Sequence, residues 1–104
     1  MFARTVSIHL KSNMLSDYTR TFENDTLPLL RQQKGFKDEI TLSNPGSLDV
    51  IAISLWESKA NAETYNTNTY PQVLRTLERM IDGAPKVQTF EAVTSTFHKL
   101  AVGA

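Results

Sequence analysis

The chain of 104 residues contains no cysteine, which excludes disulfide bonds, thiolate catalysis and zinc sites built on cysteine. Its 11 Lys and Arg residues balance 11 Asp and Glu residues, so it lacks the concentrated basic charge that a nucleic-acid partner requires. No run approaches the roughly 20 apolar residues that span a bilayer. Residues 1–9 also lack the continuous apolar segment of a signal peptide. We therefore expect a cytoplasmic protein with no nucleic-acid and no membrane partner.

Catalytic and metal-binding motifs are also missing. The sequence has no nucleophile motif, no glycine-rich phosphate loop and no metal-ligand spacing. Its two histidines, His9 and His98, lie near opposite ends of the chain, and no neighbouring pattern completes a triad or a metal site. We interpret both as strand-surface or interface residues, and we expect no metal.

The most informative stretch that is present is the longest apolar run, within residues 49–58. Hydrophobic residues make up 40% of the chain and charged residues 21%, which is typical of one globular domain spanning residues 1–104. The run is rich in β-branched residues and too short for a buried helix, so it predicts a strand covered on both faces. Strand alternation gives it two apolar faces: Val50, Ala52 and Trp56 on one, and Ile51, Ile53 and Leu55 on the other.

The rest of the chain alternates between strand and helix patterns. Strands are predicted over residues 2–10, 36–43 and 86–98, and helices from Ser12 or Ser16 to about Gln33, over residues 59–66, and from Thr69 to the stop at residues 83–85. Pro28 should kink the first helix or begin a second short one at Asp25 or Thr26. The turn at residues 44–47 predicts an antiparallel hairpin. This order is typical of the split βαβ, ferredoxin-like unit, whose first and third strands are central.

Both helices of such a unit pack on one face of its sheet. We expect Ile51, Ile53 and Leu55 to meet the helices, which leaves the other face of this strand exposed together with part of the last strand. An apolar sheet face of that size usually marks an interface. The sequence therefore predicts a homodimer in which two sheets pack face to face. The sequence does not decide which face of the last strand points inward: either Phe90 and Ala92 or Val93 and Phe97.

Three short motifs carry a family resemblance. Residues 27–31 read Leu-Pro-Leu-Leu-Arg and are followed by Gly35-Phe36, and residues 55–59 read Leu-Trp-Glu-Ser-Lys before a helix that carries Ala and Glu. Together they resemble the antibiotic-biosynthesis-monooxygenase-like (ABM) dimeric α+β barrels over roughly residues 3–97. The resemblance implies an α+β, ferredoxin-like βαββαβ antiparallel sheet with helices on one face. It also implies a dimer and a ligand site between helices and sheet.

Members of that family include cofactor-independent oxygenases of polycyclic aromatic substrates, haem-degrading oxygenases and proteins without an assigned reaction. The haem-degrading branch uses an Asn, a Trp and a haem-ligating His, at positions that correspond to Val6, Tyr65 and Arg75 here. All three residues differ from that pattern. The resemblance therefore disfavours haem degradation and implies a protein without metal, flavin or haem.

Three tyrosines suggest a ligand site. Tyr18, Tyr65 and Tyr70 fall at or beside positions predicted to face the sheet, and Arg75 is near them. Buried phenols need hydrogen-bond partners, so they could line a cavity with an apolar body and polar tips. A phenol or quinol substrate would supply the electrons, while the protein orients it and stabilises negative charge. This hypothesis of a cofactor-independent monooxygenase assigns catalysis to Tyr65 and Arg75, and substrate binding to Tyr18, Tyr70 and Trp56.

The alternative is a non-catalytic dimeric domain that binds a small molecule or only supports assembly. In that case the tyrosines pack the core with their hydroxyls at its edge, and Arg75 is solvated. A cavity of about 300 Å³ or more between helices and sheet would favour the monooxygenase, because ligand pockets begin at about that size.

Overall fold

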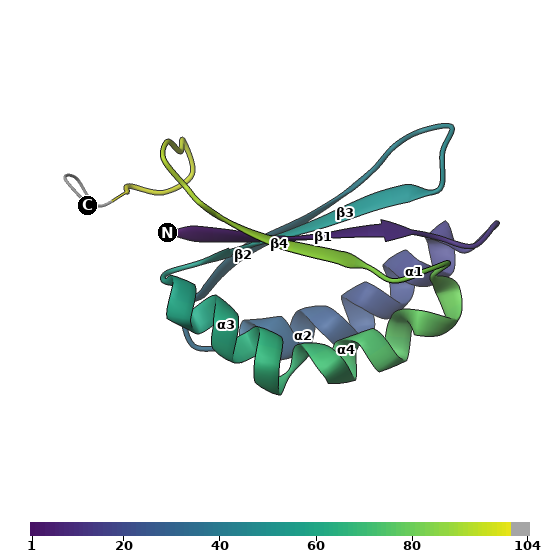
Figure 1. Ribbon diagram of the computed structural model, residues 1–104, viewed down its shortest axis with the longest axis horizontal. Coiled ribbons are helices and arrows are strands. Elements are labelled where there is room, and N and C mark those ends of the chain that lie inside the picture. Colours follow the sequence, from purple (N-terminus) through teal and green to yellow (C-terminus); the bar gives the residue numbers. More distant parts are fainter. Residues whose placement is uncertain (101–104) are drawn as a thin grey trace.

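A computed structural model describes residues 1–100 as one antiparallel sheet with all its helices on one face (Figure 1). The elements in chain order are β1 (Phe2–His9), α1 (Leu15–Thr21), the π-helical η1 (Phe22–Thr26), α2 (Leu27–Arg31), β2 (Phe36–Ser43), β3 (Asp49–Trp56), α3 (Lys59–Asn68), α4 (Tyr70–Leu77), the 3₁₀ turn η2 (Glu78–Met80) and β4 (Lys86–Glu91). The strand order is β2-β3-β1-β4, which confirms the predicted α+β topology with the first and third strands in the middle. Within residues 1–100, no helix has the length and apolar composition to cross a bilayer.

The first helical segment changes form before Pro28, and of the two predicted alternatives the second short helix is present. Thr26 stands at the N-cap of α2, without a side-chain bond, and Pro28 lies in the first turn of that helix. Just before it, η1 widens the helix into a π-helical turn. The predicted serine caps of α1 are wrong, because Met14 occupies the N-cap without a side-chain bond. Leu15, the first residue of α1, is 46% exposed and so lies outside the core.

The two faces of β3 are the reverse of those predicted. Val50, Ala52 and Trp56 face the helices and are 2%, 8% and 0% exposed. Ile51 is 40% exposed on the face of the sheet that carries no helices, called the bare face below. Because both faces are apolar, alternation alone cannot select between them. Side-chain volume and polarity decide: the large Trp56 fills the helix-side core, and its Nε1 donates to Ser54 Oγ at 2.8 Å.

A β-bulge near the start of β2 reverses the alternation of that strand. Phe36 lies opposite Trp56 and packs edge to face on it, with 5.6 Å between ring centroids. The register then shifts by one residue before Asp38. In a regular strand Phe36 and Glu39, three residues apart, would lie on opposite faces. Because of the bulge both face the helices, and Ile40 lies on the bare face. The sequence pattern, which grouped Phe36 with Ile40, cannot reveal such an insertion.

The bare face of the sheet is apolar. Its exposed hydrophobic side chains are Ile40, Leu42, Ile51 and Phe90, which are 55%, 49%, 40% and 51% exposed. Phe90 belongs to this face because it lies opposite Ala3, whereas Val87 lies opposite the helix-facing Val6. The last strand is shorter than predicted, since β4 ends at Glu91.

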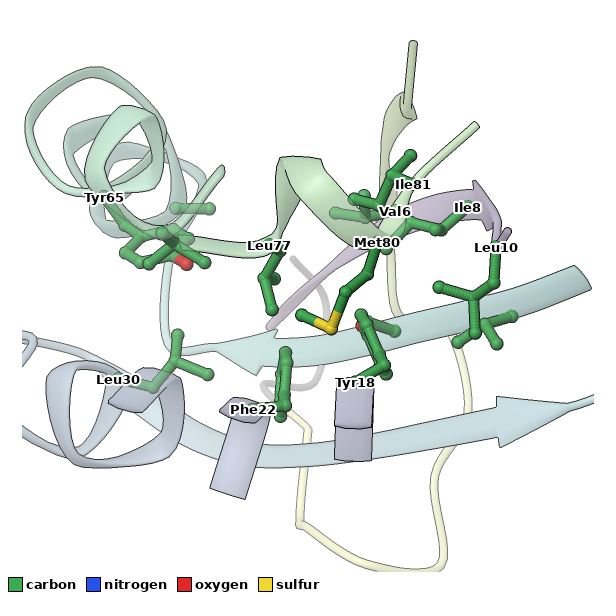
Figure 2. Close-up of a cluster of buried hydrophobic side chains, with 14 of the residues drawn as sticks. Val6, Ile8, Leu10, Tyr18, Phe22, Leu30, Tyr65, Leu77, Met80 and Ile81 are labelled. Atoms are coloured by element: carbon green, nitrogen blue, oxygen red, sulfur yellow. The ribbon is translucent and has the colours of Figure 1, made fainter. Parts of the chain in front are cut away.

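The core lies between the helices and the other face of the sheet (Figure 2). The first helical segment contributes Tyr18, Phe22 and Leu30, while α4 and η2 contribute Leu77 and Met80. Val6 and Ile8 of β1, together with Leu10 just after its end, complete the core. Each such side chain stabilises the fold by about 1.5–3 kcal/mol. The apolar side chains of the helices thus form the layer that surrounds the candidate site.

Candidate functional site

A small cavity of about 30 Å³ lies between the sheet and the helices. Residues of the three strands β1 to β3 form its floor, and residues from α1 through α4 form its roof. This volume holds one or two water molecules and is far below the roughly 300 Å³ of a pocket for an organic ligand. In this conformation the site is therefore too small for an organic ligand.

The cavity contains a buried cation that no sequence pattern had singled out. Arg4 is 3% exposed, and its Cζ lies 4.2 Å from the ring centroid of Tyr70 and 5.1 Å from that of Tyr65. One terminal nitrogen donates to Asn66 Oδ1 at 2.7 Å, while Nε has no partner. Asn66 belongs to α3, which extends two residues beyond its predicted end. Burial lowers the pKa of Arg4, but guanidinium stays charged in proteins.

The charge on Arg4 has no ion-pair partner within residues 1–100. Aromatic faces and an amide compensate it in part, since a cation over a ring is stabilised by the ring quadrupole. A buried charge is costly without an opposite charge. This arrangement therefore suits a ligand that presents a negatively charged oxygen.

Three phenols surround that cation. Tyr18 is 1% exposed, lines the cavity, and has a hydroxyl without a protein partner. Burial raises the pKa of Tyr18 above its ordinary value, and raises the pKa of Tyr65 to about 12 even though Arg4 opposes the shift. The pKa of Tyr70 is also raised by burial. All three hydroxyls are therefore protonated near neutral pH and can donate hydrogen bonds to a ligand.

Glu39 brings a carboxyl group to the same cavity. It is half-buried, and its Oε2 accepts a hydrogen bond of 2.7 Å from Thr41 Oγ1. Burial raises the pKa of Glu39, partly opposed by that hydrogen bond. Regular alternation from Phe36 would put Glu39 on the opposite face of its strand, so the sequence did not reveal this role, because the bulge of β2 is not visible in the pattern. The inward position of Arg4 was predictable, since it lies on the same face of its strand as Val6 and Ile8.

An open groove of about 260 Å³ borders the cavity on the side of the first helical segment. Tyr18, Phe22 and Glu39 line both spaces and so form the wall between them. Leu27 and Thr41 lie further out along the groove. A ligand in the groove would meet the hydroxyl of Tyr18 and the carboxyl of Glu39 before reaching Arg4.

The structure brings together three of the five predicted site residues. Tyr18, Tyr65 and Tyr70 line the one cavity. Trp56 is fully buried beneath Tyr65, with 5.1 Å between ring centroids, but does not line the cavity. Arg75 is exposed on α4 and lies outside the cavity lining, because that position of the helix points away from the sheet. The cation at the cavity is Arg4 instead.

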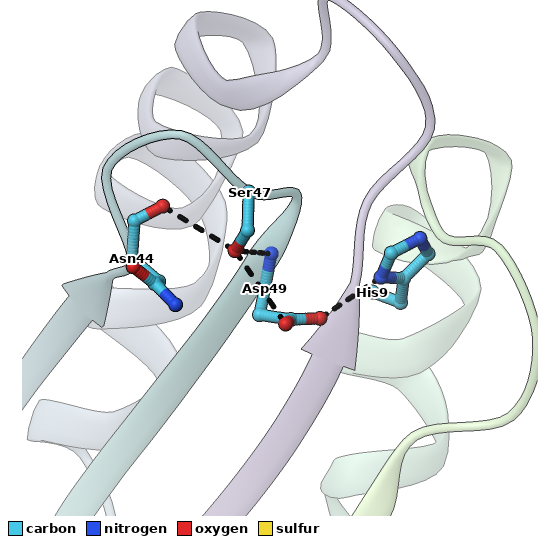
Figure 3. Close-up of polar contacts among 4 residues, drawn as sticks. All are labelled: His9, Asn44, Ser47 and Asp49. Carbon is cyan, nitrogen blue, oxygen red and sulfur yellow. Dashed lines mark hydrogen bonds and ion pairs between the residues drawn. The ribbon is translucent and has the colours of Figure 1, made fainter.

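The histidines do not form a second site. His9 Nδ1 lies 2.9 Å from Asp49 Oδ1, and Ser47 is close by (Figure 3). Ser47 Oγ, however, contacts the carboxylate of Asp49 at 3.5 Å and accepts from the Asp49 backbone N–H at 3.1 Å. A nucleophilic serine must hydrogen-bond its base, so this cluster only fixes the turn. His98 contacts Asp38 at the surface, and no group of three metal-ligating side chains occurs within residues 1–100.

No protein-family model and no curated protein sequence matches this chain. Solved structures do match it. SnoaB, a cofactor-independent oxygenase from Streptomyces nogalater, is 11% identical, with a TM-score of 0.76 over 91% of this chain and 95% of SnoaB. A candidate antibiotic biosynthesis monooxygenase from Bordetella bronchiseptica is 12% identical, with a TM-score of 0.76 over 89% and 97% of the two chains. A protein of unknown function from Nitrosomonas europaea is 17% identical, with a TM-score of 0.71 over 98% and 95%.

These identities are too low to transfer a reaction or a set of catalytic residues. The superpositions nevertheless extend over nearly all of each chain, so they compare whole folds and not a shared motif. The chain has the α+β, ferredoxin-like fold of the antibiotic biosynthesis monooxygenase structures, in agreement with the resemblance seen in its sequence.

Proposed function

We propose that the protein is a cofactor-independent monooxygenase of a small aromatic substrate, a phenol or quinol, in the cytoplasm. The observation that carries the proposal is Arg4, a buried guanidinium that lies against the rings of Tyr65 and Tyr70 and has no ion-pair partner among residues 1–100. The fold that the chain shares with SnoaB, a cofactor-independent oxygenase, supports the proposal of a cofactor-independent oxygenation.

A quinol can supply all the electrons that such a reaction needs. Oxidation of a quinol to a hydroxyquinone releases four electrons, which reduce one O₂ so that one oxygen atom enters the ring and the other leaves as water. No external reductant is required. The protein has to ionise the substrate, hold it near O₂ and stabilise the negative charge that moves from one to the other.

The residues of the cavity meet these demands. Arg4 stabilises the phenolate oxygen and then the reduced oxygen species, in a site where low polarity strengthens its field. Tyr65 and Tyr70 fix the guanidinium between their rings and donate hydrogen bonds from their hydroxyls. Tyr18, whose hydroxyl lacks a protein partner, binds the substrate at the wall of the groove. Arg75, exposed on α4, takes no part in this scheme.

The substrate enters through the groove, and the cavity has to widen to admit it. Phe22 lies in the π-helical turn η1 and lines both groove and cavity. Single π-helical turns occur often at functional sites, where they break the regular bond ladder. Movement of η1 away from β2 joins the 260 Å³ groove to the cavity and opens a path to Arg4.

A second candidate is a non-catalytic domain that binds a small molecule or only supports assembly. The small size of the cavity favours it, because about 30 Å³ leaves room for water alone. In that case the unpaired Tyr18 hydroxyl and Arg4 Nε are satisfied by buried water, and no aromatic compound enters.

Oxygen consumption with an anthrone- or quinol-type compound separates the two candidates. The wild type should consume O₂, and Arg4→Met and Tyr65→Phe should each lower kcat at least about tenfold, since each removes a group that stabilises developing charge. Arg75→Met is the matched control, because it removes an exposed arginine and should leave kcat unchanged. Wild-type protein that neither consumes O₂ nor binds the compound would favour the non-catalytic domain.

The partner in the proposal is a second copy of the chain. Ile40, Leu42, Ile51 and Phe90 supply an apolar surface on the bare face of the sheet, of the kind that marks an interface. The proposed homodimer still packs through the sheet face that carries no helices, as predicted from the sequence. On β3, however, the residues at that face are not Val50, Ala52 and Trp56 but those on the opposite side of the strand.

A further inference from the structure

We infer that Glu39 is the catalytic base, which takes the hydroxyl proton of a phenol or quinol bound in the groove between β2 and the first helical segment. The inference rests on the proposed function and adds a residue and an entry side to it. It begins from the position of Glu39, which lines both the small cavity and the larger groove.

The bulge of β2 creates this position. Without the register shift between Phe36 and Asp38, strand alternation would put Glu39 on the bare face with Ile40 on the helix side. With it, the carboxyl reaches the helix-facing layer, where Thr41 Oγ1 donates to Oε2 at 2.7 Å. Because Thr41 donates to Oε2, the carboxyl is held in place while Oε1 stays free to accept a substrate proton.

Glu39 carries the one carboxyl group among the residues that line the cavity. The titratable groups that share a pocket with it are Tyr18 of α1, Glu23 of η1, Arg4 of β1, Tyr65 of α3 and Tyr70 of α4, together with Asp38 of β2 and its partner His98 on the other face of the sheet. The phenols are neutral near pH 7, so they compete poorly for a proton. Glu23 lies on the exposed side of the groove, which leaves Glu39 as the base nearest the cation.

The proposed step is a proton transfer without electron transfer. The O–H bond of the substrate hydroxyl breaks, and a new O–H bond forms on Glu39 Oε1. The negative charge moves from the carboxylate to the substrate oxygen, on the side of the cavity that holds Arg4. O₂, the substrate that a monooxygenase consumes, oxidises the resulting phenolate in the following step. The groove is open to solvent, so the proton can then leave to water.

The half-buried environment suits this task. Burial raises the pKa of Glu39, so its carboxylate is a stronger base than an exposed one. The arrangement places a base at the entrance and an unpaired cation further inside, which favours movement of the negative charge inward.

Glu39→Gln tests the inference, because glutamine has the same shape and can still accept from Thr41. We expect kcat for a quinol of high hydroxyl pKa to fall about 100-fold or more, within the range of general-base effects, with KM little changed. Glu23→Gln is the matched control in the same groove and should leave kcat within about threefold of wild type. If Glu39→Gln does not fold, Glu39→Asp replaces it, and kcat must again fall because the carboxylate is drawn back by one methylene.

Two further readouts separate a base from a merely structural residue. The wild-type kcat/KM should fall at acidic pH as Glu39 is protonated, and Glu39→Gln should lose this dependence. A nitro-substituted catechol, already ionised at neutral pH, needs no base, so the defect of Glu39→Gln should shrink at least about tenfold with it. An equal defect with both substrates would overturn the inference.

The outcomes also distinguish the inference from the function on which it rests. If the wild type oxidises the quinol and Glu39→Gln is as fast, Glu39 is not the base and the monooxygenase proposal stands. If the wild type oxidises neither substrate, both proposals are overturned. If Glu39→Gln loses activity only with the un-ionised quinol, both are supported.

Discussion

Arg4 and Tyr70 lie face to face across the helix–sheet layer, with 4.2 Å between the guanidinium carbon and the ring centroid. The pair joins the central strand β1 to the first turn of α4, and it holds the charge of Arg4 where no carboxylate of the described residues 1–100 pairs with it. Stabilisation of a cation by an aromatic face is worth about 2 kcal/mol when it is desolvated, which offsets only part of the cost of burial.

Removal of this buried charge should therefore affect ligand binding more than stability. Arg4→Met keeps an unbranched apolar chain in the site, so we expect the free energy of unfolding to change by less than about 1.5 kcal/mol. Binding of an anionic phenol should fall at least about tenfold. Urea denaturation and fluorescence titration measure the two effects, with Arg75→Met as the exposed control. A stability loss above about 3 kcal/mol would instead identify Arg4 as a structural residue.

Gly35 should not tolerate a side chain. Its φ is +81°, and an added Cβ would lie 2.8 Å from the Cβ of Asn61. Asn61 cannot move freely, because its backbone N–H donates to Ser58 Oγ at 3.2 Å and so completes the N-cap of α3. Gly35→Ala should lower the free energy of unfolding by more than about 2 kcal/mol, since strain and overlap add.

Gly83→Ala is the control for that measurement. Gly83 has a φ of +83° with nothing within 4 Å of an added Cβ, so its substitution costs only the backbone strain of about 1–2 kcal/mol. Equal losses in the two variants, measured by urea denaturation, would show that the contact with Asn61 relaxes without cost.

Alkaline pH should destabilise the fold through Tyr65. The pKa of Tyr65 in the folded protein is about 12, above the ordinary value of 10, because burial disfavours the phenolate. Its contribution is therefore complete below pH 10 and is lost as pH rises from 10 towards 12, to a total of about 2–3 kcal/mol. Urea unfolding at about pH 9 and about pH 11 should differ less in Tyr65→Phe than in the wild type. The same pH response in both proteins would contradict the assignment.

Association through the bare face should be sensitive to one added charge. Leu42 is 49% exposed on that face, and Leu15 is 46% exposed on α1 at the opposite side of the molecule. We expect Leu42→Glu to convert a dimer into a monomer at micromolar concentration, because an interface buries charge poorly. Leu15→Glu should leave the mass in sedimentation experiments unchanged. A wild-type monomer at that concentration would contradict the proposed dimer.

The order of elements was predictable because it depends on local signals. Alternating residues in β1, the helix stop before Gly35 and the turn at residues 44–47 each act within a few positions. The start of α3 at residue 59 was predictable as well, since the Ser58 side chain before it needs only its own helix to find a donor. These signals determine a topology with β3 beside β1 at the centre of the sheet.

The site was less predictable because it depends on relations between elements. Alternation could not orient β3, whose two faces are equally apolar, and it could not reveal the bulge that turns Glu39 inward. Arg75 was paired with the tyrosines by nearness in sequence, whereas Arg4 reaches them from a strand more than 60 residues away, as its bond to Asn66 illustrates. The tyrosines themselves were found because large phenols at helical spacing have few places to lie but the core.

Beyond its bulge, β2 belongs to two surfaces at once. Glu39 and Thr41 line the groove, while Ile40 and Leu42 lie on the bare face between and beside them. Neighbouring residues of a strand share one backbone and cannot move independently. A shift of β2 that widens the groove therefore displaces the bare face by the same amount. In a pair of subunits packed through those faces, entry of a substrate into one subunit would press on the sheet of the other. The two sites of a dimer would then be mechanically coupled through a single strand.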